Sequence, residues 1–206
     1  MAMKYLETMM TESVLRAQQQ YYGHTAKMTD APERDLLGEE EAEFIAARES
    51  FYLGTVSQTG WPYIQHRGGP KGFLRLLTPS TLVFADYQGN RQLVSTGNLS
   101  VDDRVSLFLM DYPNRTRLKI LGYARVEDAG LHPDLAVQLS NPGMRARVDR
   151  IVFIDVLSFD WNCPKYITPR YSVEEVEELT GPLRTRIAEL ETALRATRAG
   201  SEVAPA

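Results

Sequence analysis

The sequence lacks several features that whole classes of protein require. It contains one cysteine, Cys163, so it cannot form an internal disulfide, and this usage fits a reducing cytoplasm. Its longest apolar stretches, such as residues 105–110, fall far short of the roughly 20 residues of a membrane-spanning helix. Acidic residues (27) outnumber Lys and Arg (23), which argues against a nucleic-acid or anionic-membrane partner. We therefore expect a soluble cytoplasmic protein with neither kind of partner.

The signatures of the commonest catalytic sites are also absent from the sequence. The histidines, His24, His66 and His132, are scattered, and no His-x-x-x-His or Cys-x-x-Cys spacing occurs, so we expect no metal. There is no Gly-x-Ser-x-Gly elbow, no Walker loop and no Gly-x-Gly-x-x-Gly fingerprint. These absences argue against the commonest hydrolase, NTPase and Rossmann interpretations.

Helical patterns dominate the first fifty residues. Apolar residues recur three and four positions apart between Leu6 and Tyr21, which is typical of a helix, and Gly23 provides a stop signal. A second helix is predicted from Gly38 to Arg48, with three glutamates in its first turn, where the helix dipole favours negative charge. We assign residues 1–50 to an N-terminal helical extension.

The central part of the chain has the pattern of strands joined by turns. β-Branched and aromatic residues form short runs separated by turn residues such as Thr59-Gly60 and Pro79, which predicts hairpins. Six or seven such strands favour an antiparallel barrel over alternating β-α units. The predicted strands are residues 51–57, 61–67, 74–77, 81–86, 104–110, 117–127 and 151–159, with short helices near 91–98 and 133–139.

Residues 169–206 are predicted to form a C-terminal helical tail. Ser172 and Glu175 make a capping-box pattern near its start. Gly181-Pro182 interrupts the pattern, after which apolar residues return at spacings of four, three and four. This stripe fits either a helix that packs on its own barrel or a contact between subunits. Its members are Leu183, Ile187, Leu190 and Leu194.

Arginine and glycine recur where predicted strands end. Residues 66–72 (HRGGPKG) combine two cations with three glycines, and Arg75 follows on the next strand. Residues 89–92 (GNRQ) precede a predicted helix, and residues 114–117 (NRTR) add two guanidinium groups. Glycine allows close backbone approach to a ligand, while Arg and the N–H groups of a helix start bind phosphate. Each segment alone fits a solvated turn, but their recurrence predicts a bound anion such as a nucleotide phosphate.

The order of these segments resembles one known family. In sequence they read PYIQHR (62–67), LVFADYQGNRQ (82–92), NL (98–99), RVSLFL (104–109), RLKILGYARV (117–126) and WNCP (161–164). Together they resemble the pyridoxamine 5′-phosphate oxidase-like FMN-binding split barrels over roughly residues 51–167. The resemblance implies a mainly β (α+β) fold with flanking helices: a six-stranded antiparallel split β-barrel over residues 51–168. It also implies a homodimer that binds FMN at the subunit interface.

The resemblance assigns ligand roles position by position. Arg67, with Gln65, His66 and Gly68 beside it, would lie along the flavin ring and ribityl chain, and Arg75 would reach the phosphate. An Arg fork suits phosphate, and donors near the flavin nitrogens tune its electronics. The residues implied to face the flavin are Phe84, Ala85 and Asp86.

The remaining implied ligands come from a loop and from two later strands. The family's Ser-Arg-Lys phosphate clamp becomes Asn90, Arg91 and Gln92, which keeps the central Arg. Arg117 stands where the family has Gln. Trp161 matches a Trp that the other subunit usually supplies. No catalytic residue is assigned.

Two departures from the oxidase proper affect the expected activity. Residues 68–72 resemble an insertion beside the flavin, and the oxidase's C-terminal substrate-binding Arg and His have no match. We therefore expect an FMN-dependent oxidoreductase of an unidentified small molecule that is not an efficient vitamin B6 oxidase. A nicotinamide nucleotide or a reductase would donate electrons where the substrate is reduced. Cys163 fits a buried packing residue better than a thiol activated by Lys165.

Two other interpretations remain open at this point. One is a flavin-binding sensor or carrier without turnover. The other is a barrel that binds a different flat cofactor, such as haem or a deazaflavin. The sequence does not identify the substrate or the electron acceptor.

Overall fold

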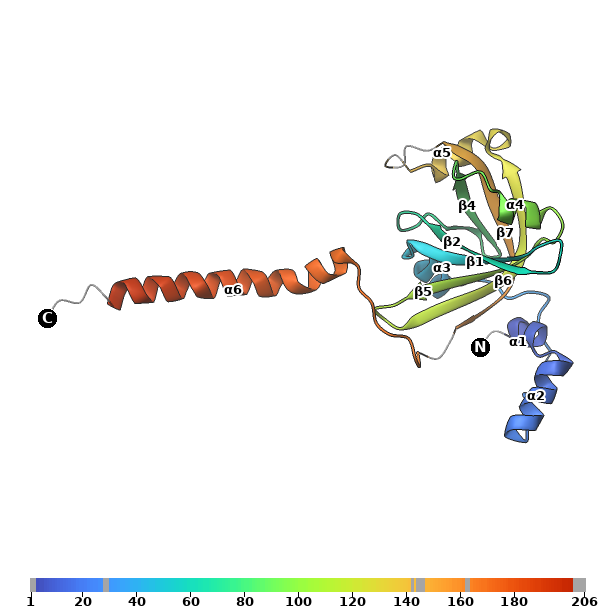
Figure 1. Cartoon of the computed structure of the whole chain (residues 1–206), viewed down its shortest axis with the longest axis horizontal. Coiled ribbons are helices and arrows are strands. Elements are labelled where there is room, and N and C mark those ends of the chain that lie inside the picture. Colours follow the sequence, from blue (N-terminus) through green and yellow to red (C-terminus); the bar gives the residue numbers. More distant parts are fainter. Residues whose placement is uncertain (1–2, 28–29, 142, 144–146, 162–163, 202–206) are drawn as a thin grey trace. The chain divides into compact units, whose positions relative to one another are not determined.

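The structure is a computed structural model that describes residues 3–27, 30–141, 143, 147–161 and 164–201 (Figure 1). The chain divides into two units. The first combines Met1–Asp111 with Arg115–Tyr166 and contains the sheet, and the second combines Tyr112–Asn114 with Ile167–Ala206. Cys163 lies outside the described residues.

One seven-stranded antiparallel sheet forms the centre of the first unit. Its strand order is β2-β1-β5-β6-β7-β4-β3. The expected mainly β fold, with an antiparallel sheet and flanking helices, is thus confirmed. The strands are β1 (Ser50–Val56), β2 (Pro62–Gly68), β3 (Arg75–Thr78), β4 (Thr81–Tyr87), β5 (Arg104–Asp111), β6 (Thr116–Asp128) and β7 (Val148–Trp161).

The expected number of six strands is wrong by one. The seventh comes from β3, which has four residues and lies at the edge of the sheet, where it pairs with β4. The pairing shifts register between Leu76 and Thr78. The sequence pattern predicts this strand at residues 74–77, and β3 confirms it; the count of six comes from the family resemblance.

Alternating apolar residues give the sheet one buried face. In β5, for example, Val105, Leu107 and Leu109 are buried, while Arg104 and Ser106 are exposed. One core cluster contains buried side chains from β1, β4, β5, β6 and β7, together with residues that precede β1. The sheet therefore curls around a shared core, as Figure 1 shows.

β7 joins the two parts of the curled sheet. Its 14 residues pair with β4 over residues 148–155 and with β6 over residues 150–161. The β6–β7 register shifts between Leu121 and Gly122, and such bulges bend a sheet. A Cβ placed on Gly122 would lie 2.5 Å from the carbonyl oxygen of Asp155, so the two backbones approach closely here.

Three helices lie close to the sheet. Ile45 of α3 (Glu39–Ala46) is buried in the main core. α5 (Pro133–Leu139) matches its predicted range, and its Leu139 packs in a second cluster with Val83 of β4 and Phe153 of β7. α4 (Val94–Leu99) follows β4 and starts three residues later than expected.

Two further helices, α1 (Met3–Met9) and α2 (Glu12–Tyr22), precede α3. The predicted stop at Gly23 is confirmed, because this residue ends α2 with a φ of 71° that glycine adopts readily.

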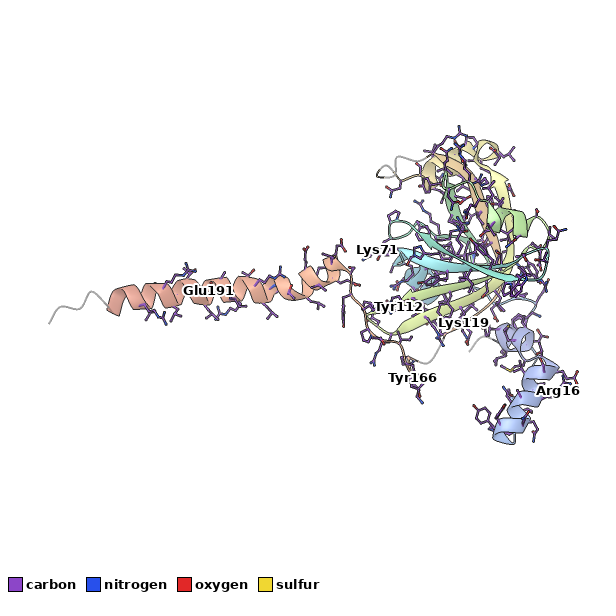
Figure 2. The ribbon with its side chains drawn as sticks, in the orientation of Figure 1. Arg16, Lys71, Tyr112, Lys119, Tyr166 and Glu191 are labelled. Carbon is purple, nitrogen blue, oxygen red and sulfur yellow. The ribbon has the colours of Figure 1, made fainter. Side chains whose placement is uncertain are left out.

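A half-buried lysine links α1 to β6. The Lys119 Nζ atom lies 4.6 Å from the centre of the Tyr5 ring and 2.7 Å from a carboxylate oxygen of Asp160 (Figure 2). Burial lowers the pKa of Lys119, but hydrogen bonds with Asp160 and Tyr5 outweigh it and raise the pKa above its ordinary value. Lys119 therefore keeps its positive charge over the whole physiological range.

The second unit consists mainly of one long helix, α6 (Val173–Ser201). Its capping box is confirmed: the Ser172 N–H donates to Glu175 Oε2 at 2.7 Å, and the Glu175 N–H donates to Ser172 Oγ at 3.1 Å. The expected interruption is wrong, because Pro182 lies inside the helix. One missing N–H donor costs stability, but helix propagates from both sides of it. Among the described residues, no helix is long and apolar enough to cross a membrane.

Candidate functional site

A polar pocket of about 460 Å³ is lined by strands β2, β4 and β7 and by the loop into α4. This volume lies within the usual range of small-molecule sites. β2 contributes Tyr63, Gln65 and Arg67, which share one face because successive side chains of a strand alternate. The other lining residues are Asp86, Tyr87, Gln88, Gly89, Asn90, Arg91, Gln92, Leu93, Val94, Ser95, Thr96, Asp149 and Arg150.

Two arginines share one buried carboxylate in this pocket. Arg67 Nη1 donates to Asp86 Oδ1 at 2.7 Å, while Arg150 Nε and Nη2 both lie 2.9 Å from Asp86 Oδ2. The three residues come from β2, β4 and β7, so the network connects β2 to strands that are not its neighbours in the sheet. One carboxylate cannot neutralise two guanidinium groups. The cluster therefore keeps a net positive charge that favours an anion.

Arg67 also has an unsatisfied donor. Its Nε atom is buried and has no hydrogen-bond partner among the described residues. Its guanidinium carbon lies 5.7 Å from the centre of the Phe84 ring, which packs beneath it. Buried donors in folded proteins nearly always have a partner, and one left unpaired costs roughly 1–3 kcal/mol. The orphaned N–H therefore marks a position where a ligand acceptor would stabilise the protein.

The loop between β4 and α4 has an unusual backbone. Arg91 and Leu93 have φ values of 62° and 52°, the left-handed region that residues other than glycine seldom adopt. The Gln92 N–H donates to Asn90 Oδ1 at 3.1 Å, which turns the chain between them. These conformations delay the start of α4. Strained backbone of this kind is concentrated at ligand sites.

Two side-chain hydrogen bonds hold α4 to the strands beside the pocket. Ser95 Oγ donates to Gln65 Oε1 at 2.7 Å, and Asn98 Nδ2 donates to Thr55 Oγ1 at 2.9 Å. The first bond orients the Gln65 amide with its oxygen toward Ser95, so the other branch of this amide carries two N–H donors. The pocket thus gains an oriented donor group from β2.

The structure brings six of the thirteen predicted ligands together. These six line the pocket: Gln65, Arg67, Asp86, Asn90, Arg91 and Gln92. The alternation of β2 turns His66 to the opposite face, where its ring centre lies 5.7 Å from that of Tyr52. Gly68 and the rest of the expected insertion, residues 68–72, are also outside the lining. The predicted ligand roles remain predictions for all thirteen residues.

The other predicted ligands are distributed over the barrel. Phe84 is buried in the core, and its neighbour Ala85 packs against the second cluster. Arg75 is exposed, with its Nε 3.4 Å from the Gly72 carbonyl oxygen. The guanidinium carbon of Arg117 lies 5.3 Å from the centre of the Phe108 ring.

Trp161 is held by its own chain. Its Nε1 donates to Glu41 Oε1 at 2.7 Å, and its ring centre lies 4.8 Å from that of Phe44, edge to face. Glu41 also accepts a hydrogen bond from the Gly38 N–H at 2.9 Å. Trp161 thereby anchors α3 to the end of β7.

Sequence reasoning missed Arg150, which is central to the pocket. Arg150 lies directly opposite Asp86 in the β4–β7 pairing. The two are 64 residues apart in sequence, so no local pattern links them. The available signal was a cation beside the apolar run 151–154, because β7 reads VDRIVFIDV from Val148.

The fold and pocket define a class: a curled antiparallel β-barrel with an arginine-rich pocket. The family model described as pyridoxamine 5′-phosphate oxidase matches residues 37–146, more than half of the chain. The chain therefore belongs to the pyridoxamine 5′-phosphate oxidase-like family, which confirms the resemblance seen in the sequence. A comparison with curated protein sequences gives no match.

Several solved structures are similar in fold. Group A Streptococcus HupZ is 13% identical, with a TM-score of 0.48, and the alignment covers 66% of this chain and all of HupZ. A Lactobacillus delbrueckii protein with the provisional name pyridoxamine 5′-phosphate oxidase is 21% identical, with a TM-score of 0.47 and coverage of 61% and 93%. An FMN-binding protein from Syntrophomonas wolfei is 13% identical, with a TM-score of 0.44 and coverage of 60% and 85%.

Proposed function

We propose that the protein binds FMN in this pocket and acts as an FMN-dependent oxidoreductase on a small molecule. The observation that carries the proposal is the cluster of Arg67, Asp86 and Arg150, with its excess positive charge and the orphaned Nε of Arg67. A guanidinium group that the pocket's carboxylate does not fully neutralise favours an anionic or carbonyl-rich ligand. Membership of the family makes a flavin the first candidate.

The pocket residues fit FMN in charge and in donor type. Asn90, Arg91 and Gln92 would hold the phosphate, because a guanidinium fork binds two phosphate oxygens at once. Gln65 and Arg67 would donate to the polar edge of the flavin ring and so orient it. When bound, FMN supplies a hydride acceptor that no side chain can provide. The protein would contribute position and electrostatics.

We also propose a homodimer with the cofactor at the interface. Trp61, just before β2, is 75% exposed and Ile64 of β2 is 70% exposed, so each leaves a large apolar side chain that a second subunit would cover. An interface of this obligate kind buries about 2,000 Å² or more. Sedimentation that shows a stable, flavin-loaded monomer would contradict it.

Flavin binding is tested by absorbance and titration. The purified protein should carry the two visible absorption bands of oxidised flavin. Arg91→Ala should weaken FMN binding by about 1.5–3 kcal/mol, the range for a hydrogen bond to a charged group. Arg16→Ala, at an exposed arginine of α2, is the matched control and should leave the affinity unchanged (Figure 2). Wild-type affinity in Arg91→Ala would show that the phosphate lies elsewhere.

The spectrum also separates the rival interpretations. A Soret band would indicate haem, and the blue-shifted band of a deazaflavin would indicate that cofactor. A flavin that cycles with neither nicotinamide nucleotides nor a reductase would favour a sensor or carrier. Steady-state reoxidation with candidate donors therefore distinguishes an enzyme from a binding protein.

We propose further that vitamin B6 phosphates are poor substrates. The chain has no match for the oxidase's C-terminal substrate-binding Arg and His, and remote phosphate contacts orient the reacting carbon as well as adding affinity. We expect kcat/KM on pyridoxine 5′-phosphate far below ~10⁴ M⁻¹s⁻¹, the lower end for competent enzymes. A kcat/KM at or above that value, measured by oxygen consumption, would reveal a substrate site that the sequence comparison missed.

A further inference from the structure

α6 carries an unbroken heptad pattern. Starting from Val173, every third and then fourth position is apolar or Thr through four repeats, which is the spacing of coiled-coil a and d positions. We call this stripe the α6 seam. Its heptad spacing continues unchanged across Gly181 and Pro182, and neither of these two residues belongs to it. The a positions are Val173, Thr180, Ile187 and Leu194, and the d positions are Val176, Leu183, Leu190 and Thr197.

The α6 seam is narrow, and the rest of the second unit leaves it largely exposed. Outside the seam, Leu179 is the one large aliphatic residue between Val173 and Arg198, and the other positions hold mainly Glu, Arg, Thr and Ala. A helix that packs on a globular core needs a wider apolar stripe, whereas a strict a/d stripe is typical of a coiled coil. The exposed fractions of Leu183 and Leu190 are 64% and 52%. A second helix of the same kind is the surface that fits this seam.

The charges beside the seam specify how two copies fit together. The e positions alternate in sign: Glu177, Arg184, Glu191 and Arg198. In an antiparallel pair, e positions face e positions of the other helix. When Ile187 packs against Leu190 of the partner subunit, Arg184 faces Glu191 of the partner subunit. In the same register Glu177 faces Arg198 of the partner subunit, so every e position meets its opposite charge.

Other arrangements lose this complementarity. A slip of one heptad in one direction places Glu191 opposite Glu191 of the partner subunit, and a slip in the other direction places Arg184 opposite Arg184 of the partner subunit. A parallel pair matches Arg186 with Glu191 of the partner subunit but leaves Arg184 and Arg198 facing uncharged residues. Repulsion between like charges therefore disfavours the neighbouring antiparallel registers. Attraction between opposite charges favours the register that packs Ile187 against Leu190 of the partner subunit.

We propose that α6 is a self-association element that pairs with α6 of a second copy as an antiparallel two-stranded coiled coil. Its central layers join Ile187 to Leu190 of the partner subunit and Leu183 to Leu194 of the partner subunit. The polar layer joins Thr180 to Thr197 of the partner subunit. Pro182 occupies an outward position, so the bend it causes does not place its ring in the seam. The pairing requires no flavin and is independent of the proposed function.

Disulfide trapping tests both the partner and the orientation. Full-length Thr180→Cys and Thr197→Cys, each with Cys163→Ser, are co-expressed with tags of different mass and then oxidised. The antiparallel register brings residue 180 next to residue 197 of the other chain, so the mixed disulfide should dominate. Two copies of residue 180 would be 17 residues apart along the pair, about 25 Å, which is too far for a disulfide.

A matched pair of outward positions controls for random collision. The control uses Thr185→Cys and Thr192→Cys in the same background. In the proposed register residue 185 is level with residue 192 of the other chain, but both side chains face solvent, so little disulfide should form. Arg184→Glu should abolish most of the mixed 180–197 product, and adding Glu191→Arg should restore it. Same-residue disulfides would show a parallel pair and overturn the proposal. It would equally be overturned by the absence of any interchain product, the result expected of a helix that packs on its own chain.

Discussion

The barrel and α6 use the same apolar residues in opposite ways. Leu107 and Ile120 in the barrel are completely buried by strands of the same chain, whereas Ile187 and Leu190 on α6 stay about half exposed, at 55% and 52%. A sheet that curls buries its own apolar face, but a single helix has no second layer to cover its stripe. The stability of the barrel is therefore internal to the chain. The apolar seam of α6 contributes only when another surface covers it.

The largest change in stability is expected from a substitution in the core of the barrel. Ile120→Ala should lower the free energy of unfolding by about 2–5 kcal/mol, because it leaves a cavity in a core that cannot collapse completely. Ile187→Ala on α6 should change the same transition by less than about 0.5 kcal/mol, because both tryptophans, Trp61 and Trp161, lie in the first unit and report the unfolding of the barrel. Urea unfolding followed by tryptophan fluorescence measures both. Equal shifts would mean that α6 folds as part of the barrel core.

The next largest effect concerns the link between α3 and β7. Trp161→Phe keeps the ring against Phe44 but removes the donor to the buried Glu41 carboxylate, which should cost about 1.5–3 kcal/mol. Trp61→Phe is the control, since Trp61 is exposed, and it should shift the urea midpoint very little. If the two variants unfold at the same urea concentration, the Trp161–Glu41 bond contributes nothing.

Adding one methyl group should have opposite effects in the two regions. Gly122→Ala forces a Cβ against the Asp155 carbonyl oxygen, and overpacking of this kind costs about 1–3 kcal/mol. Gly181→Ala meets no atom within 4 Å and replaces a poor helix former inside α6, which should stabilise the helix by about 0.5–1 kcal/mol. Thermal unfolding followed by circular dichroism compares them. A stabilising Gly122→Ala would show that β6 and β7 are further apart than described.

The smallest effect is expected at an exposed charge before β5. Hydrogen bonds from the Arg104 side chain and backbone lower the pKa of Asp102 from 3.8 to about 2. A carboxyl with a lowered pKa stabilises the folded state above pH 4, and this contribution is lost as the pH falls through about 2. Asp102→Asn should therefore be slightly less stable than wild type at pH 6 and indistinguishable from it near pH 2. A difference that persists at pH 2 would exclude this ionisation as the cause.

Much of the fold follows from local patterns, but the pocket depends on strand neighbours. The alternation in β5, the capping box at Ser172 and the stop at Gly23 each depend on residues close in sequence, so they could be predicted. The helix that continues through Pro182 could not, because its pattern is interrupted by Gly181-Pro182.

The site shows the same division. The sequence by itself determined that Arg67, Asp86 and Arg91 are available at strand ends, and that α6 carries a periodic apolar stripe. The tertiary structure alone decided that Arg150 lies opposite Asp86, that His66 faces away from the pocket and that Trp161 binds Glu41, 120 residues earlier. Periodicity is a property of neighbouring residues, whereas pairing and register arise when distant strands compete for the same core.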